Sequence, residues 1–186
     1  DFQIGRLLDK LEDLGLAEDT LVIFTSDNGM NLGQHGIWGK GNGTFPQNMY
    51  DSSVKVPFIA SWPGHFAKGA VCSELFSHYD ILPTLCHLAG CPVNTKQEIP
   101  GHSFARWLED PELESSRPVV VFDEYGPVRM IRDKEWKLVL LYPYGPNEFY
   151  HLTEDPDETE NLFHDPAQDC LLYTSPSPRD PKTSRM

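Results

Sequence analysis

The strongest constraint on the fold is an amphipathic segment followed directly by a short apolar one. Apolar residues recur at helical spacing across residues 4–15, with charged residues on the opposite face, which predicts a helix ending at Gly15. Residues 21–25 are apolar on both faces, as in a strand of a parallel sheet that is covered on both sides. We expect the helix to pack on this strand. A helix, a turn and a buried strand are half of a βαβ repeat, so the sequence predicts an α/β fold.

The charge balance limits the partners. The 186 residues carry 15 Lys and Arg against 28 Asp and Glu, a formal net charge of −13. This argues against nucleic acid, whose phosphates need a basic surface. A small anionic substrate stays open, because a bound cation and one Lys can reverse the local field. No apolar run reaches the ~20 residues of a membrane span, and the cysteines form no C-x-x-C pair, which excludes a zinc ribbon.

The segment after the predicted strand is rich in glycine. Residues 26–51 mix glycines with polar residues and show no period, which predicts a long loop, and a long loop inside a domain is usually functional. A strand is predicted over residues 54–62 and a short helix near residues 104–108. Asp80 is expected at the N-cap of a helix that runs to residue 89.

From residue 111 the pattern changes to strands. β-branched and aromatic residues are concentrated at positions 119–122, 128–131 and 136–142. Consecutive strands without intervening helices predict an antiparallel sheet. We therefore expect residues 111–168 to form a small antiparallel β subdomain, distinct from residues 1–110.

The last segment differs from the rest. Residues 169–186 are rich in Ser and Pro and cannot form a core. The string from Leu171 to Asp180 resembles translated sequencing-adaptor sequence, and a native disordered tail is the alternative. We predict a non-native or disordered tail and leave it out of the fold.

Two oxygen-bearing side chains follow the first predicted strand. Asp27 and Asn28 lie at its carboxyl end, the edge where ligands bind in open α/β sheets. A carboxylate beside an amide oxygen suits Ca²⁺ or Mg²⁺, whereas an imidazole in place of Asn28 would favour a transition metal. The alternative is a simple turn, with Gly29 supplying a positive φ.

Two further polar residues lie in the predicted loop. Lys40, between Gly39 and Gly41, is positioned to meet an anionic group as a point charge. His35 is a candidate proton donor or hydrogen-bond donor to a substrate. Each has an ordinary alternative, a solvated loop Lys and a His without a direct role.

Together these motifs resemble the sulfatase family of the alkaline phosphatase superfamily. The resemblance covers about residues 1–166. It includes a closing pattern, L-x-x-D-P-x-E-x-x-N-L, at residues 152–162. The other matching segments are residues 4–9, 20–29, 32–36, 38–40, 56–59, 62–64 and 80–85.

The resemblance implies a sulfatase that hydrolyses a small-molecule or carbohydrate sulfate ester at a Ca²⁺ site. It implies that residues 1–110 are the C-terminal part of an alkaline-phosphatase-like α/β sandwich. In the family, residues matching Asp27 and Asn28 bind the metal, and a Lys matching Lys40 contacts the sulfate. His35 is expected to bind substrate. A secreted, periplasmic or lysosomal location is also implied.

The nucleophile of the family has no counterpart in this chain. That nucleophile is a formylglycine made from the Cys of a C-x-P-x-R motif, and none of the four cysteines here stands in one. The remaining metal ligands of the family also belong to segments upstream of Asp1. We therefore interpret the chain as the C-terminal portion of a sulfatase, inactive by itself.

Three alternatives remain open at this point. The first is a phosphodiesterase or phosphonate monoester hydrolase of the same superfamily, which shares the metal pair and the Lys. The second is a non-catalytic homologue that binds sulfated glycans. The third is an unrelated extracellular structural domain in which Asp27 and Asn28 form only a turn.

Overall fold

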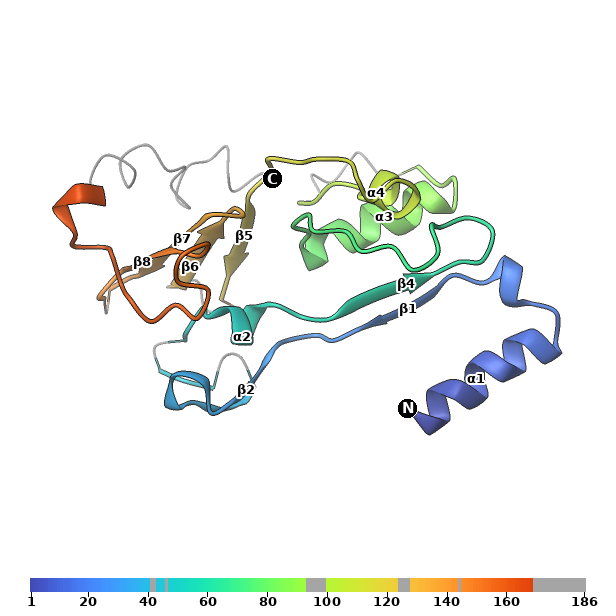
Figure 1. Ribbon diagram of the computed structural model, residues 1–186, viewed down its shortest axis with the longest axis horizontal. Coiled ribbons are helices and arrows are strands. Elements are labelled where there is room, and N and C mark those ends of the chain that lie inside the picture. The colour runs from blue at the N-terminus through green and yellow to red at the C-terminus, as the bar shows by residue number, and fades with distance from the viewer. Residues whose placement is uncertain (41–42, 46, 93–99, 124–127, 144, 169–186) are drawn as a thin grey trace.

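The computed structural model describes residues 1–40, 43–45, 47–92, 100–123, 128–143 and 145–168. One part of it holds most of the helices and two small two-stranded sheets, and the other holds a four-stranded sheet. A short helix, α2 (Asp51–Val54), lies between the two parts (Figure 1). The predicted tail, residues 169–186, falls outside the described residues.

The predicted N-terminal helix is present as α1 (Phe2–Asp13). Gly15, with φ 67°, donates its N–H to the carbonyl of Glu12, and Leu16 donates to Leu11. This pair of bonds is the Schellman motif, which a glycine completes without steric cost. No residue of α1 is buried. The expected packing of its apolar stripe on the next strand is therefore wrong for the part of the chain that the structure describes.

The predicted apolar strand is also present, with a different partner. A 3-10 turn, η1 (Ala17–Asp19), leads into β1 (Val22–Thr25), which pairs antiparallel with β4 (Phe58–Ser61). Phe24 is 48% exposed and Ile59 is 62% exposed. The expectation of a parallel strand covered on both faces is thus wrong within the described residues. The apolar composition predicted a strand. It did not predict whether the strand pairs in a parallel or an antiparallel way, or how exposed its faces are.

The glycine-rich segment contains regular secondary structure, although its sequence shows no period. A hairpin is formed by β2 (Met30–Leu32) and β3 (Trp38–Lys40), which are joined through a 3-10 turn, η2 (Gln34–Gly36). Strands of three residues are too short to show a period, so the prediction of a continuous loop over residues 26–51 was wrong here.

The strand expected over residues 54–62 is shorter than predicted. Its first residue belongs to α2, and β4 begins only after Pro57. Proline has no N–H to give to a ladder, which limits it to strand ends and edges.

Three helical segments follow in the middle of the chain. These are η3 (His78–Asp80), α3 (Ile81–Leu88) and α4 (Ala105–Glu109). They confirm the predicted helices near residues 80–89 and 104–108 to within a few residues. Figure 1 shows α3 and α4 close together beside the β1–β4 pair.

Asp80 stands at the N-cap position of α3, as predicted, but its side chain binds other groups. The carboxylate is buried and accepts the N–H of Ser77 at 2.9 Å and the N–H of His102 at 2.7 Å. It also pairs with the guanidinium of Arg117 at 2.8 Å. One buried carboxylate therefore fastens the start of α3 to two later segments.

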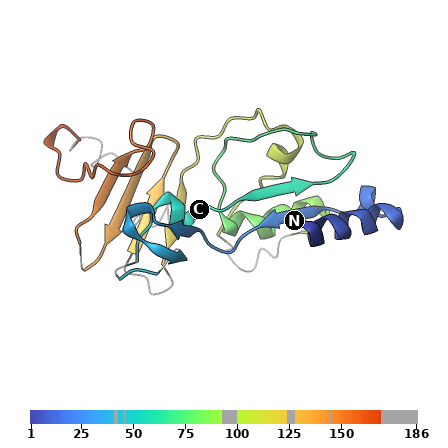
Figure 2. The same ribbon diagram turned by 60° about the horizontal axis from the view of Figure 1, so that its bottom comes forward.

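The C-terminal part is an antiparallel sheet with strand order β5–β6–β7–β8. Three strands lie where the sequence predicted them, and the fourth, beyond the prediction, follows a Pro-containing turn. The strands are β5 (Val119–Phe122), β6 (Val128–Arg132), β7 (Trp136–Leu141) and β8 (Glu148–His151). A 3-10 turn, η4 (Pro166–Gln168), follows. In Figure 2 the strands lie side by side at one end of the molecule, with α1 at the other.

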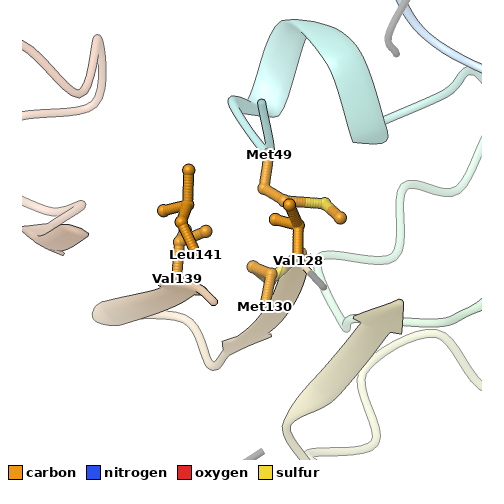
Figure 3. Close-up of a cluster of buried hydrophobic side chains, with 5 residues drawn as sticks. All are labelled: Met49, Val128, Met130, Val139 and Leu141. Carbon is orange, nitrogen blue, oxygen red and sulfur yellow. The ribbon is translucent and has the colours of Figure 1, made fainter. Parts of the chain in front are cut away.

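The main hydrophobic core lies on this sheet. Side chains alternate between its faces, so each face has its own buried cluster. On one face Met49, from the segment before α2, packs against residues of β6 and β7 (Figure 3). The clusters are Met49, Val128, Met130, Val139 and Leu141 on that face, and Val120, Ile131, Leu138 and Phe149 on the other. The boundaries 1–110 and 111–168 stay a prediction.

No helix among the described residues is long and apolar enough to cross a membrane.

Candidate active site

The predicted metal pair, Asp27 and Asn28, follows β1 directly. Ser26 Oγ donates to the carbonyl of Asn28 at 2.8 Å, and the amide Nδ2 of Asn28 donates to the carbonyl of Gly29 at 2.7 Å. The carboxylate of Asp27 is exposed, and neither it nor Asn28 Oδ1 accepts a hydrogen bond within the described part of the chain. The bend thus presents one charged and one neutral oxygen group, both unengaged.

Gly29 is required here by a close backbone approach. Its N–H donates to the carbonyl of Ser53 at 3.0 Å, and a Cβ at this position would lie 2.2 Å from the carbonyl oxygen of Ser52. Gly29 is not among the glycines with positive φ. The alternative in which Gly29 supplies a left-handed turn is therefore wrong, and the bend after β1 is held directly against α2.

Lys40 is brought back toward the metal pair by the β2–β3 hairpin. In the register of this hairpin Lys40 lies opposite Met30, which is two residues after Asn28. Its side chain is exposed and forms no ion pair with a described residue. The ammonium group is therefore available to an anionic ligand.

Asp27, Asn28 and Lys40 line the same cavity, which has a volume of about 860 Å³. Most of its other lining residues are apolar. They come from α2, β4, the middle of the chain and β5, and include Val54, Phe58, Phe76, Phe104 and Trp107. Three of the four predicted site residues therefore line one open, largely apolar cavity.

His35 is held elsewhere. It adopts a left-handed conformation, with φ 52°, and its ring stacks on Tyr50 with centroids 3.6 Å apart. It is not among the residues that line the cavity. Its predicted contact with substrate stays a prediction, and the contact that the structure does show is with an aromatic ring.

The first half of the chain matches a known family. Residues 1–91 match the family model of the sulfatases. The chain belongs to the sulfatase family. It is 31% identical to the choline-sulfatase of Rhizobium meliloti (strain 1021) over 171 residues, which are 89% of this chain and 31% of that protein. It spans about a third or less of the length of the first curated relatives that it matches.

Solved structures extend the likeness to the fold of nearly the whole chain. A structure in complex with its substrate D-glucosamine-2-N,6-O-disulfate has TM-score 0.77 and 26% identity, covering 91% of this chain and 35% of that one. The phosphonate monoester hydrolase of Agrobacterium radiobacter has TM-score 0.75 and 28% identity, covering 91% and 36%. The expected fold, the C-terminal part of a sulfatase with a small antiparallel sheet, is confirmed.

In this sulfatase chain the side chains of Asp27 and Asn28 carry the kinds of oxygen atom that calcium sites use. Ca²⁺ takes six to eight oxygen ligands, and carboxylate and amide oxygens are of the right kind. Over the ranges that the structure describes, no three His, Cys, Asp or Glu side chains come together as a metal site. The pair can supply two ligands, so a complete site needs donors from other segments.

A buried ion cluster that the sequence did not predict lies beside α2. Lys137 is completely buried, and its Nζ lies 2.9 Å from Asp51 Oδ1 and 2.5 Å from Glu158 Oε1. Arg132 Nη1 also binds Asp51, at 2.6 Å from Oδ1. Burial by itself raises the pKa of Asp51, but the charges of Lys137 and Arg132 outweigh it and hold this pKa below its usual value.

Two sequence signals could have pointed to this cluster. Lys137 interrupts the otherwise apolar strand β7, and a charge inside a buried strand needs a partner. Glu158 stands in the closing pattern that carried the family resemblance, and it has φ 54°, rare for a residue other than glycine. The partners themselves were beyond prediction, because Asp51 is far from both in the sequence.

A third carboxylate, that of Glu148, interacts electrostatically with the cluster. Burial raises the pKa of Glu148, and the charge of Glu158 raises it further, while a hydrogen bond with Tyr150 acts in the opposite direction. Burial also raises the pKa of Tyr50 and of Tyr150. Glu148 is thus a carboxylate whose ionisation the fold disfavours.

Proposed function

We propose that this chain forms part of the active site of a sulfate-ester hydrolase, with Asp27 and Asn28 as Ca²⁺ ligands and Lys40 as the sulfate contact. One observation carries the proposal: unengaged oxygen groups and an unpaired ammonium group, twelve or more residues apart in the sequence, line one cavity. Membership of the sulfatase family supports the reaction class.

Each residue has a distinct chemical task in this proposal. Asp27 and Asn28 bind the cation, which when bound supplies fixed positive charge beside the sulfate oxygens. The Lys40 ammonium binds the sulfate as a point charge and stabilises the negative charge that moves to the leaving oxygen. The hairpin fixes the backbone that carries Lys40, and a charge positioned before the reaction is what makes such contacts effective in catalysis.

The nucleophile comes from outside these 186 residues in this proposal. No cysteine of the chain stands in the C-x-P-x-R motif from which formylglycine is made. Nucleophilic catalysis needs an activated nucleophile within reach of the sulfur. The purified 186-residue chain, assayed with an aryl sulfate and excess Ca²⁺, should therefore show no turnover. Turnover above a heat-inactivated control would contradict this part of the proposal.

A phosphonate monoester hydrolase is the second candidate, favoured by the TM-score of 0.75 with the enzyme of that name from Agrobacterium radiobacter. A non-catalytic protein that binds sulfated glycans is the third. Parallel assays of the protein expressed from its complete reading frame, with aryl sulfate and aryl phosphonate esters, distinguish the three. Faster hydrolysis of the sulfate supports our proposal, and binding without turnover of either ester supports the third candidate.

The test of the site compares Asp27→Ala with Lys40→Ala in that complete protein. Lys40→Ala should lower kcat/KM by on the order of 10²-fold or more, with a stability change of at most about 0.5 kcal/mol because the side chain is exposed. It should keep its Ca²⁺ affinity, measured by calorimetric titration. Asp27→Ala should lose Ca²⁺ affinity and activity together.

Lys68→Ala is the matched control for this test. Lys68 is exposed and does not line the cavity, so its removal should leave activity unchanged. Near-normal turnover by folded Lys40→Ala would remove Lys40 from the sulfate site. Full Ca²⁺ affinity in Asp27→Ala would remove Asp27 from the metal site.

A further inference from the structure

Helix α2 is held on one side against the metal pair. The carbonyl of Ser53 accepts the N–H of Gly29 at 3.0 Å. Asn31, which is completely buried, donates from Nδ2 to Ser53 Oγ at 2.8 Å and accepts from Ser52 Oγ at 2.5 Å. Gly29, the residue after Asn28, leaves no room for a Cβ because its backbone is in direct contact with the backbone of α2. Any shift of α2 therefore shifts the bend that carries Asp27 and Asn28.

On its other side α2 is held by the C-terminal part of the chain. Glu158 Oε2 accepts the N–H of Asp51, the first residue of α2, at 2.6 Å. The other oxygen, Oε1, binds Lys137, which also binds the carboxylate of Asp51. Lys137 and Glu158 are both buried. The start of α2 is thus fixed by a backbone bond and a buried ion pair.

A helix this short cannot fix its own position. Four residues make too few internal hydrogen bonds to be stable alone, and the first N–H groups of a helix have no acceptor inside it. Stability is a weak explanation for a buried ion pair, because apolar residues of similar volume often serve as well. Geometric control of α2 is the role that the contacts support.

We infer that Glu158, together with Lys137, is a positioning residue for the metal pair, acting through α2. This inference rests on the proposed function, since it concerns the Ca²⁺ site at Asp27 and Asn28. Residues that orient metal ligands from behind typically change metal affinity or activity by 10–100-fold when they are removed.

The test uses two double variants that differ at one position, in the protein expressed from its complete reading frame. Lys137→Met/Glu158→Gln removes both charges but keeps a side-chain oxygen to accept the Asp51 N–H. Lys137→Met/Glu158→Leu removes the charges and that acceptor as well. When only one partner of a buried ion pair is removed, the remaining unpaired charge strongly destabilises the fold. Both double variants avoid this, because each removes the charges of Lys137 and Glu158 together.

The expected result is a difference in Ca²⁺ affinity between the two variants, measured by calorimetric titration. Lys137→Met/Glu158→Leu should bind Ca²⁺ about tenfold or more weakly than Lys137→Met/Glu158→Gln, with a matching loss of kcat/KM. Equal Ca²⁺ affinities in the two folded variants would overturn the inference, because a purely structural pair alters the unfolding midpoint and leaves the affinity of the folded protein unchanged.

A milder variant covers the case in which a double variant does not fold. Ser52→Ala removes the hydroxyl that joins α2 to Asn31 and should weaken Ca²⁺ binding, whereas unchanged affinity would overturn the inference. Failure of the proposed function gives a different result. In that case the parent protein does not bind Ca²⁺, or Asp27→Ala binds it as tightly as the parent. Either result contradicts both the proposed function and the inference that rests on it.

Discussion

The N-terminal and C-terminal parts of the chain differ in how much of their apolar surface they bury. Among the described residues, the buried hydrophobic side chains come from residue 104 onward, apart from Met49. The large exposed hydrophobic side chains come from the first 85 residues, apart from Tyr142. The region that holds the candidate site therefore has little core of its own, and the region without site residues has most of it.

This difference shows where the site obtains its rigidity. Asp27 and Asn28 follow β1, a strand of a two-stranded sheet whose faces are largely exposed. Helix α2, which contacts Gly29, is bound to β6 and β7 through the ion pairs of Asp51 with Arg132 and Lys137. Precise placement of ligands needs support from packed side chains. Within the described residues that support comes from the C-terminal part.

The largest expected effect is a difference in the free energy of unfolding between two Phe→Ala variants, one in each part of the chain. Phe149 is 1% exposed and Phe24 is 48% exposed. In the 186-residue chain, Phe149→Ala should lower the free energy of unfolding by about 3–5 kcal/mol. Phe24→Ala should lower it by about 1 kcal/mol or less. Denaturant titration followed by circular dichroism measures both.

Phe2→Ala, at a side chain that is 77% exposed, is the control for this pair. Equal losses at Phe149 and Phe24 would contradict the comparison. The protein expressed from its complete reading frame gives a further test. The apolar run in β1 predicts that other segments pack on Phe24 there, so the stability lost on Phe24→Ala should rise toward the stability lost on Phe149→Ala.

A pH-dependent effect of intermediate size is expected at Glu148, in the C-terminal sheet. Its pKa is raised in the folded state, so from its unfolded pKa of about 4.5 upward the unfolded chain loses its proton first. Stability from this group therefore falls as the pH rises toward the folded pKa. Glu148→Gln removes this fall, so the stability of the variant relative to the parent should increase between pH 4 and pH 7.

Paired urea titrations at the two pH values test this sign. Glu160→Gln, at an exposed carboxylate, is the control for the Glu→Gln substitution itself. A relative stability of Glu148→Gln that stays constant or falls with pH would show that Glu148 ionises freely in the folded protein.

The smallest effect is expected in α1, which has no buried residue. A Cβ on Gly5 would meet nothing within 4 Å, and alanine is favoured over glycine inside a helix by about 0.5–1 kcal/mol. Gly5→Ala should slow amide exchange within α1 without changing the global unfolding midpoint of the 186-residue chain. A higher global midpoint would show that α1 unfolds together with the rest.

Local sequence patterns predicted those elements whose signals are local. The helical period and Gly15 predicted α1, and the β-branched runs predicted β5, β6 and β7 to within a residue or so. The hairpin β2–β3 and helix α2 were missed, because elements of three or four residues carry too little pattern. The direction of β1 was predicted wrongly, because an apolar run indicates a strand but does not determine the direction of its partner strand.

The candidate site was only partly predictable, for a different reason. Asp27, Asn28 and Lys40 could be proposed from short motifs, and the cavity that they share agrees with that choice without testing their roles. Arg132, Lys137 and Glu158 meet Asp51 across 81, 86 and 107 positions of sequence. No window on a single sequence connects residues so far apart, so the cluster became visible only in three dimensions.

The long reach of the contact between Asp51 and Glu158 has a consequence for synthesis on the ribosome. Chains grow from the N-terminus at about 5–20 residues per second, so these 107 positions take on the order of 5–20 s to translate. During that interval the segment with Asp27, Asn28 and Lys40 has already been made, while its anchor has not. The bend that carries Asp27 and Asn28 can reach its final position only after Glu158 has emerged, which makes it one of the last features of this chain to assemble.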